Sequence, residues 1–274
     1  MNVNLDGLRV PCRAAVLGSP ITHSLSPLLH RAAYAALGLD WFYEAVEVTK
    51  PQLGEFIAGL DDSWAGLSLT MPLKETVIDL LVEIDPVARM TGAVNTVLPY
   101  GSGWRGMNTD VFGMVEALCE KGLSIPVESV LILGAGATAR SAVAAAAQLG
   151  CTMLTVCARN TSAAHAVLDV ASNFGIRADA KAWLASELIS DFDLVISTVP
   201  GDIASPWVEF ALEARGALLD VSYHPWPSPL ARNWPGSVIA SGRDMLLWQA
   251  VEQVHLMTGR PAPAAAMRAA LPEN

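Results

Sequence analysis

A glycine-rich turn near the middle of the chain constrains the fold more than any other feature. Its residues match the pattern G-x-G-x-x-A and are Gly134, Ala135, Gly136, Ala137, Thr138 and Ala139. The turn follows the apolar run Val130–Leu133 and opens an alanine-rich segment that ends near Leu149. In this setting the glycines permit a tight turn and a close approach of the backbone to a pyrophosphate. The sequence therefore favours a dinucleotide-binding turn over an ordinary strand-to-helix connection.

The segments on either side of this turn predict two α/β domains. After it, short apolar strands are expected at Leu154–Ala158, Leu194–Ser197 and Ala217–Val221, as in a doubly wound domain. Before it, strands over 13–18, 41–48 and 64–70 alternate with helices, which implies a mainly parallel sheet covered by helices. A last helix over 245–257 can return to the first domain. We predict a first domain of residues 1–110 plus 243–274 and a Rossmann-type domain of residues 111–242.

Composition excludes several classes of protein. Hydrophobic residues make up 52% and charged residues 16% of the 274 positions, unlike the composition of disordered chains. Acidic residues outnumber basic ones by 27 to 17, and the net charge of −10 disfavours nucleic acid or an anionic membrane surface as a partner. Asp6, Arg9 and the lack of an apolar stretch near them predict no secretory signal. No membrane span is predicted either, because the longest uncharged run contains Gln148 and Gly150.

The cysteines and histidines predict no metal site. The four cysteines lack CxxC and zinc-finger spacings, and the histidines lack the spacing of metal-ligand motifs. Reduced, mostly buried thiols are expected, which indicates a cytoplasmic location. The tryptophans, among them Trp104, Trp226 and Trp248, are expected to pack in the interior rather than stack on a cofactor.

The segment after the second strand of the Rossmann-type domain indicates which dinucleotide binds. An NAD site usually ends this strand with an acidic residue for the ribose 2′-hydroxyl. Here no Asp or Glu occurs between Glu128 and Asp169, and the strand is followed by Arg159 and Asn160. An arginine at this place can pair with a 2′-phosphate. The sequence therefore favours NADP(H), although Arg159 could also be an exposed charge without a ligand.

Polar residues in the first domain stand at the ends of its predicted strands. Ser24 and Ser26 lie just before a helix, where their hydroxyls suit a substrate carboxylate or, alternatively, only cap the helix, with Ser26 as N-cap. Lys74 follows an apolar strand, Asn95 lies in another short apolar segment, and Asp110 lies at the junction with the second domain. Ligands of open α/β sheets bind outside the carboxyl ends of the strands. Lys74 and Asp110 are therefore candidates for an acid/base pair, although each alone is more often a surface charge.

Ordered motifs along nearly the whole chain resemble those of the shikimate dehydrogenase family. They are Gly-Ser-Pro-Ile-Thr-His-Ser-Leu-Ser-Pro from 18, Leu-Thr-Met-Pro-Leu-Lys from 69, Gly-Ala-Val-Asn-Thr from 92, Asn-Thr-Asp from 108, the turn at 134–139, Tyr223–Leu230 and Gly242–Gln249. The resemblance implies reversible reduction of 3-dehydroshikimate to shikimate with NADPH, on the route to chorismate. It also implies a monomer or homodimer whose first domain binds the substrate, with both ligands held between the domains.

The resemblance further implies a role for each matching residue. Lys74 is similar to the family's catalytic lysine, and Asp110 to its carboxylate partner. Ser24, Ser26 and Tyr223 are similar to residues at the substrate carboxylate. The residues similar to ring-hydroxyl ligands are Thr70, Asn95 and Gln249. Those similar to residues around the nicotinamide are Thr198, Val199 and Gly242.

Two positions depart from the family's common pattern. Ser68 stands where the family commonly has asparagine, and Ala163 stands where many relatives have a second arginine near the adenine. The second departure leaves open an NAD-preferring quinate/shikimate dehydrogenase. A dinucleotide-binding regulator would be expected to lack the lysine and aspartate, which are present here. A methyltransferase would leave Ser24, Ser26 and Lys74 unexplained.

Overall fold

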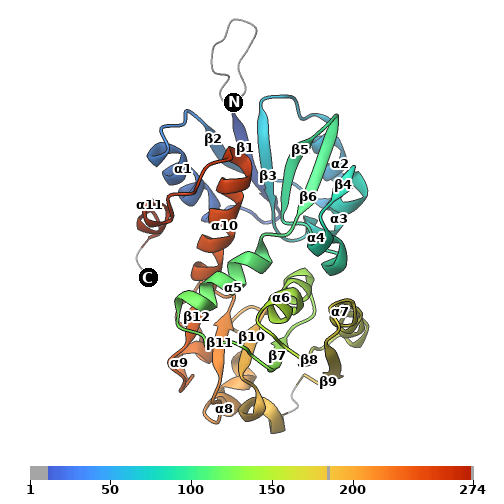
Figure 1. Cartoon of the computed structure of the whole chain (residues 1–274), viewed down its shortest axis with the longest axis vertical. Coiled ribbons are helices and arrows are strands. Elements are labelled where there is room, and N and C mark those ends of the chain that lie inside the picture. Colours follow the sequence, from blue (N-terminus) through green and yellow to red (C-terminus); the bar gives the residue numbers. More distant parts are fainter. Residues whose placement is uncertain (1–11, 184–185, 273–274) are drawn as a thin grey trace, which may run out of the picture. The chain divides into compact units, whose positions relative to one another are not determined.

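The structure is a computed structural model that describes residues 12–183 and 186–272 (Figure 1). The chain divides into two compact units, Met1–Thr109 with Gln249–Asn274 and Asp110–Trp248. The sequence-based division falls after residues 110 and 242 instead. Asp110 belongs to the second unit as the first residue of α5, and so do the first turns of α10. No helix among the described residues is long and apolar enough to cross a membrane.

The first unit is a six-stranded sheet with helices on both faces (Figure 1). Its elements in chain order are β1 (Arg13–Gly18), α1 (Ser26–Ala36), β2 (Phe42–Glu47), η1 (Lys50–Gln52), α2 (Leu53–Ala58), β3 (Trp64–Leu69), α3 (Leu73–Thr76), η2 (Val77–Leu80), β4 (Glu83–Ile84), α4 (Pro86–Thr91), β5 (Thr96–Tyr100), β6 (Gly103–Met107), the second part of α10 (Gly242–Thr258) and α11 (Ala264–Ala269). The strand order is β2-β1-β3-β5-β6-β4. β1 pairs parallel with β2 and β3, whereas β5 runs antiparallel to β3 and β6. The sheet is therefore mixed.

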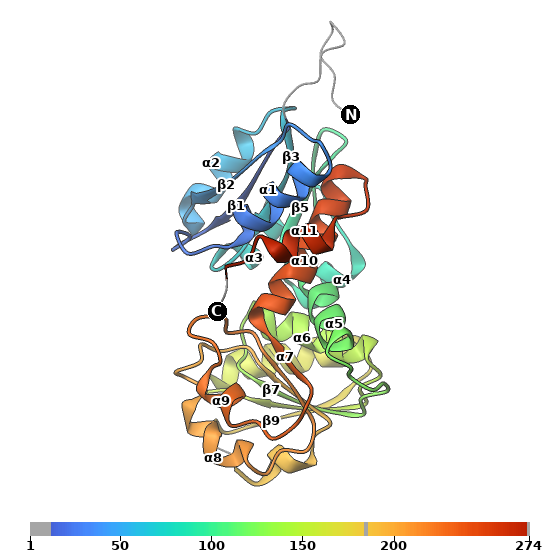
Figure 2. The same ribbon diagram turned by 90° about the vertical axis from the view of Figure 1, so that its left-hand side faces the viewer.

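Alternate residues of the central strands serve the two faces of this sheet, as the pleat requires. Leu17, Leu67 and Leu69 belong to the core cluster that also contains Leu53 and Ile57 of α2. The residues between them face the other way: a Cβ on Gly66 would lie 3.0 Å from Met257 of α10. Figure 2 shows α2 on one side of the sheet and α1, α10 and α11 on the other. Ser68 is thus directed to the α10 face.

The second unit contains a six-stranded sheet in which every pairing is parallel. Its elements are α5 (Asp110–Glu120), β7 (Ser129–Leu133), α6 (Ala137–Gln148), β8 (Met153–Cys157), α7 (Thr161–Asn173), β9 (Arg177–Lys181), η3 (Ser186–Asp191), β10 (Leu194–Ser197), η4 (Ser205–Trp207), α8 (Val208–Ala211), β11 (Ala217–Asp220), α9 (Pro229–Arg232), β12 (Ile239–Ser241) and the first part of α10. The order β12-β11-β10-β7-β8-β9 confirms the predicted doubly wound domain.

The core of the second unit explains its short apolar strands. Leu131, Val195 and Leu218 from neighbouring strands pack with Trp207 and Trp234 on one face. Figure 2 shows α8 and α9 on that side of the sheet and α6 and α7 on the other. A central parallel strand is covered on both faces, so it is apolar at every position, as β7 is after its first residue. The packing roles expected for Trp104 and Trp226 are also confirmed, since both pack against core clusters.

Several sequence-based element boundaries are wrong. α1 does begin at Ser26, but its N-cap is Leu25, which makes no side-chain hydrogen bond to the helix. α10 begins at Gly242, three residues before the predicted start, because the Asp244 side chain accepts from the Ser241 N–H and stabilises an earlier first turn. The hairpin of β5 and β6 has no counterpart in the sequence-based interpretation. Its strands contain Pro99, Gly103 and Gly106, which weaken a strand pattern.

Candidate active site

Each unit has a point at which the strand order reverses about a central strand. In the first unit β1 lies between β2 and β3, and in the second unit β7 lies between β8 and β10. Ligands of such sheets bind at the carboxyl ends of the strands beside this point. These ends lead into Gly18 and Thr70 in the first unit and into Gly134 and Thr198 in the second. The predicted site residues gather at these two edges.

The loop from Gly18 to Ser26 lies at the carboxyl end of β1. A Cβ on Gly18 would collide with the Thr70 methyl group, so only glycine lets β1 and β3 end side by side here. The Ser24 hydroxyl accepts a hydrogen bond from the Ser26 N–H at 3.3 Å. Ser26 is already the first helical residue and does not precede the helix, as the sequence-based interpretation has it. Ser26 is buried, and its hydroxyl interacts with that of Tyr43.

Thr70 and Lys74 follow β3 on either side of the turn into α3. The Thr70 N–H donates to the Leu17 carbonyl at 2.9 Å, which continues the pairing with β1 beyond the end of β3. Thr70 then closes the turn, since its carbonyl accepts from the Leu73 N–H at 2.8 Å. The Lys74 carbonyl accepts from the Val94 N–H at 2.8 Å. This bond brings the backbone of Lys74 next to the segment that carries Asn95.

The Asn95 side chain is buried, and its orientation is fixed. Its Oδ1 accepts from the Thr109 N–H at 2.7 Å, from the Thr109 hydroxyl at 3.1 Å and from the Thr96 hydroxyl at 2.8 Å. A backbone N–H can only donate, so the atom that faces it must be the oxygen. The Nδ2 is thereby directed to the other side, where it lies 3.5 Å from Oε1 of Gln249. Asn95 and Gln249, far apart in sequence, are thus brought together.

Asp110 is the buried first residue of α5 in the second unit. A carboxylate at a helix N-terminus is favoured by the helix dipole. The residue before the pair Thr109–Asp110 is also held firmly. The Asn108 N–H donates to Asp85 Oδ2 at 3.2 Å, and its Nδ2 donates to the Thr91 hydroxyl at 3.1 Å. The asparagine and the threonine of the Asn-Thr-Asp motif therefore have structural roles.

The glycine-rich turn lies between β7 and α6 in the second unit. Gly134 has a φ of +110°, and a Cβ there would lie 2.5 Å from the Thr198 hydroxyl and 2.9 Å from Val199. The structure thus brings together Gly134, Thr198 and Val199, which the sequence places far apart. A Cβ on Gly136 would meet no atom within 4 Å, and no side chain caps α6 there. An open helix N-terminus of this kind fits a pyrophosphate.

Arg159 and Asn160 follow β8 at the same edge of the sheet. Arg159 is exposed. The Asn160 side chain caps α7, since its Oδ1 accepts from the Ala163 N–H at 3.1 Å. This cap uses the oxygen of the amide, so the groups that Asn160 offers at the edge are N–H donors. An exposed guanidinium and an amide N–H fit a 2′-phosphate.

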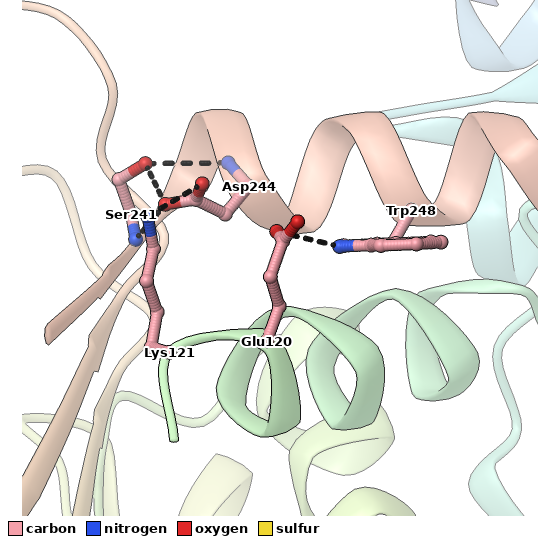
Figure 3. A network of polar contacts seen from close by, with 5 residues as sticks. All are labelled: Glu120, Lys121, Ser241, Asp244 and Trp248. Carbon is pink, nitrogen blue, oxygen red and sulfur yellow. Dashed lines mark hydrogen bonds and ion pairs between the residues drawn. The ribbon is translucent and has the colours of Figure 1, made fainter. Parts of the chain in front are cut away.

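Gly242 begins α10 where β12 ends. A Cβ on Gly242 would overlap the Val221 carbonyl, so no larger residue fits without a shift of the backbone. A polar network next to it joins α5 to α10 (Figure 3). Asp244 accepts from the Ser241 hydroxyl at 2.6 Å and lies 3.1 Å from the Lys121 ammonium. In the same network Trp248 Nε1 donates to Glu120 at 3.1 Å. The network stabilises the helix start that contains Gly242.

We expect the network to stabilise the second unit less at acid pH. Burial is the largest influence on the pKa of Asp244 and raises it, but hydrogen bonds from Ser241 and the Lys121 charge together outweigh it and hold the pKa below its ordinary value of 3.8. A lowered carboxyl pKa stabilises the fold above the ordinary value, and this stability is lost as the pH falls through the folded-state pKa. We expect Asp244→Asn to reduce the free energy of unfolding by less than about 1 kcal/mol at pH 7. The deficit should shrink below about pH 4.

Urea unfolding at a series of pH values measures this effect. Lys121→Met, which removes the charged partner and leaves the carboxylate, is the matched variant. A deficit of Asp244→Asn that stays constant from pH 7 to pH 3 would contradict the assigned cause.

Tyr223 lies in a loop that Asp220 closes. The Asp220 carboxylate is fully buried, accepts from the Ser222 N–H at 3.0 Å and accepts from the Ser228 hydroxyl at 2.5 Å. The Ser228 hydroxyl also caps α9 by accepting from the Ala231 N–H at 3.1 Å. Burial raises the pKa of Asp220, and the hydrogen bonds act against this shift. One buried carboxylate thus fixes both ends of the segment that carries Tyr223.

The thiols are free and show no arrangement for catalysis. Cys12, Cys151 and Cys157 are buried, as predicted, whereas Cys119 is exposed. Burial raises the pKa of Cys151 and of Cys157 to about 11, so both are protonated thiols at neutral pH. Among the residues that the structure describes, no three His, Cys, Asp or Glu side chains form a group that could hold a metal ion.

Family models match most of the chain. The model of the shikimate dehydrogenase substrate-binding domain matches residues 16–97, and that of the shikimate 5′-dehydrogenase C-terminal domain matches residues 242–271. The region between them, residues 130–240, matches the NADP-binding domain of saccharopine dehydrogenase. Together with the parallel sheet and the glycine-rich turn, these matches define an NADP-binding oxidoreductase with a separate substrate domain.

Known relatives are similar over nearly the full length. The NADP(+) shikimate dehydrogenase of Nitrosopumilus maritimus is 33% identical over 94% of this chain and 97% of its own length. The crystal structure of Mycobacterium tuberculosis shikimate dehydrogenase matches with a TM-score of 0.87 and 38% identity, over 95% of this chain and 98% of that one. The Thermus thermophilus enzyme, solved with NADP(H) and shikimate, matches with a TM-score of 0.79 and 30% identity, over 95% of this chain and 100% of that one.

This chain therefore belongs to the shikimate dehydrogenase family. It is an oxidoreductase with shikimate dehydrogenase activity and uses NADP(H) as its cofactor. The cofactor predicted from Arg159 and the acid-free run before Asp169 is thereby confirmed at the level of the family.

Proposed function

We propose that the chain reversibly reduces 3-dehydroshikimate to shikimate with NADPH, with Lys74 and Asp110 as its acid/base pair. The observation that best supports a substrate-binding site in the first unit is the orientation of the buried Asn95 amide. Its oxygen is saturated by Thr109 and Thr96, so its N–H groups are directed to the side of Gln249. A donor directed in this way suits a ring hydroxyl. Thr70 and Lys74 follow the carboxyl end of β3, and Asn95 immediately precedes β5 in the same unit.

Ser24 and Ser26 are proposed to bind the substrate carboxylate. Ser24 precedes the 11-residue helix α1 and Ser26 begins it, and the N-cap residue Leu25 makes no side-chain hydrogen bond to the helix. Hydroxyl donors and a helix N-terminus both favour an anion. Tyr223 would add a further hydroxyl donor. Burial raises its pKa, which keeps the phenol protonated.

Lys74 and Asp110 are proposed to handle the proton of the reaction. The bound nicotinamide supplies the hydride on reduction and takes it on oxidation. Lys74 would donate a proton to the reacting oxygen on reduction and accept it on oxidation, while Asp110 orients the ammonium and stabilises its charge. This assignment is supported by the family's motifs at residues 69–74 and 108–110.

The cofactor is proposed to bind at the carboxyl edge of the second sheet. The turn Gly134–Ala139 and the N–H groups of α6 would hold the pyrophosphate. Arg159 and Asn160 would hold the 2′-phosphate. Thr198, Val199 and Gly242 would line the nicotinamide site. The close contact of Gly134 with Thr198 and Val199 supports a continuous site along this edge.

Removal of a hydroxyl at the carboxylate seat tests the proposed substrate. We expect Ser24→Ala or Ser26→Ala to weaken shikimate binding by about 1.5–3 kcal/mol, as for a hydrogen bond to a charged group. The loss should shrink for an analogue that lacks the carboxylate. Initial rates with shikimate and with this analogue measure both effects.

Thermal unfolding of both serine variants provides the control. Ser24 also accepts from the Ser26 N–H, and Ser26 also contacts Tyr43, so each substitution affects the fold as well. An equal loss of binding for shikimate and for the analogue would show that the serines act only on the fold.

The oligomeric state and the cytoplasmic location remain predictions.

A further inference from the structure

A buried hydrogen-bonded network lies between the first sheet, α1 and α10. Its members are Ser26, His30, Tyr43, Ser68, Thr96 and Gln253, each at most 5% exposed. None carries an ion pair among the described residues. Buried polar groups cost free energy unless they are paired, so a network of this size in the core of one unit requires a reason. Its two ends are next to residues of the proposed substrate seat.

Gln253 of α10 is the centre of this network. Its Nε2 donates to the Asn95 carbonyl at 3.3 Å and to the Thr96 hydroxyl at 3.0 Å. A carbonyl can only accept, so the amide nitrogen must face it and Oε1 must face the opposite side. There Oε1 accepts from the Ser68 hydroxyl at 2.8 Å. His30 Nε2, 3.2 Å away, must then also carry a hydrogen.

The rest of the network follows from this orientation. Burial lowers the pKa of His30 to about 3, although the hydrogen bond that His30 donates to Gln253 acts in the opposite direction. The ring is therefore neutral, and Nδ1 accepts from Tyr34, 3.3 Å away. Burial likewise raises the pKa of Tyr43. The Tyr43 phenol therefore keeps its hydrogen and donates it to Ser68 at 2.7 Å. The Tyr43 oxygen is left to accept from Ser26.

One end of the network thus holds the Asn95 amide. Because the Thr96 hydroxyl accepts from Gln253, its own hydrogen is directed to Asn95 Oδ1, 2.8 Å away. Gln253 also binds the Asn95 carbonyl directly. At the other end the Ser26 side chain interacts with the Tyr43 phenol. Gln253, Ser68 and Tyr43 therefore form a hydrogen-bonded chain that runs from the Asn95 carbonyl to the phenol beside Ser26.

This connection gives a physical account of Ser68. The family commonly has asparagine there, whose amide would extend from β3. In this chain the side chain at that place is a short hydroxyl, and the amide reaches it from α10 as Gln253. Gly66, two residues before Ser68 on the same face, permits α10 to approach, because a Cβ there would lie 3.0 Å from Met257.

We propose that Gln253, acting through Ser68 and Tyr43 on one side and Thr96 on the other, is a positioning residue that sets the spacing of Ser26 and Asn95 for the substrate. This proposal rests on the proposed substrate seat. Gln253 touches neither substrate nor cofactor in it. Its effect is expected on the binding of shikimate and not on that of NADP, whose proposed site is in the second unit.

Two buried tyrosines next to His30 provide a matched pair of variants. Tyr34 and Tyr43 are each 1% exposed, and each would lose one hydroxyl on substitution by phenylalanine. Only the Tyr43 hydroxyl lies between Ser26 and Ser68; that of Tyr34 contacts His30 Nδ1 and Met257. We expect Tyr43→Phe to raise the KM for shikimate about three- to tenfold. Tyr34→Phe should change it by less than about twofold at a similar cost in thermal stability.

Gln253→Met is the stronger variant, since it keeps the length of the side chain and removes every hydrogen bond of the amide. We expect a KM for shikimate raised at least about tenfold, with the KM for NADP within about twofold of wild type. If Gln253→Met does not fold, the comparison of Tyr43→Phe with Tyr34→Phe tests the positioning role by itself. Equal effects of Tyr34→Phe and Tyr43→Phe, or a parallel rise of both KM values, would overturn the proposal.

Ser26→Ala in the same series separates this proposal from the proposed substrate seat. A raised KM for shikimate in Ser26→Ala but not in Tyr43→Phe would overturn the positioning role and leave the seat intact. A wild-type KM for shikimate in Ser26→Ala would show that Ser26 does not bind the substrate carboxylate. The positioning role would then be contradicted as well. A raised KM for shikimate in both, with Tyr34→Phe unaffected, supports the positioning role.

Discussion

Lys74→Ala is expected to lower kcat by roughly 10²–10⁴-fold, the usual range for loss of a general acid/base. Alanine cannot donate or accept the proton at the reacting oxygen, whereas the substrate is held mainly by hydroxyl and amide groups of other residues. The KM for shikimate should therefore change much less than kcat. Initial rates at saturating NADP measure both parameters. Lys50→Ala, which removes an exposed lysine of the same unit, is the matched control.

Asp110→Asn shows whether the two residues act together. If the carboxylate serves through the ammonium, the loss in Lys74→Ala/Asp110→Asn should be far smaller than the product of the two single losses. If the two residues act independently, the loss of kcat in the double variant should equal the product of the two single losses. A folded Lys74→Ala enzyme with near wild-type kcat would remove Lys74 from the mechanism.

Arg159→Ala is expected to raise the KM for NADP roughly ten- to a hundredfold, while the weaker use of NAD stays almost unchanged. The guanidinium gains a charge-assisted pair only when the 2′-phosphate is present. With alanine at position 163 a single arginine serves this phosphate, so we expect the lower end of the range. Steady-state rates with NADP and with NAD measure the effect.

Arg177→Ala provides the control for charge alone. Arg177 is also exposed, but it begins β9 and so lies at the amino edge of the same parallel sheet. It should leave both cofactors unaffected. Equal damage to NADP and NAD in Arg159→Ala would show that Arg159 supports the fold of the edge and does not read the phosphate.

The second unit could be predicted well because its signals are local. An apolar strand, a glycine turn and a small-residue helix occur within about twenty residues, and each has one physical interpretation. The doubly wound order then follows from the right-handed connections between parallel strands. The contact of Gly134 with Thr198 could not be read from the residues alone, because it depends on β7 and β10 being neighbours.

The first unit was harder to predict because its long-range pairings have weak sequence signals. The hairpin of β5 and β6 contains proline and glycines, and the antiparallel pairing of β3 with β5 follows from no local pattern. Ser26 illustrates the difficulty at one residue. A serine before a proline is typical of an N-cap, yet its hydroxyl turns to Tyr43 because the interior offers a buried partner.

Most of the candidate site residues came from motifs, and the residues that support them did not. Thr96 and Thr109 fix the Asn95 amide, but threonines in buried strands give no signal of their own. Gln253 is one amide within a long helix, and only the position of β3 next to it shows that Ser68 is its partner. The departure at Ser68 was visible in the sequence, whereas its partner Gln253 was visible only in the structure.

The most direct test of the account is a matrix of initial rates for the purified protein: shikimate and quinate, each with NADP and with NAD, followed at the absorbance of the reduced nicotinamide. We expect the highest kcat/KM for shikimate with NADP, a marked loss when NAD replaces NADP, and little turnover of quinate with either cofactor. A preference for NAD, or turnover of quinate with NAD that equals that of shikimate with NADP, would contradict it.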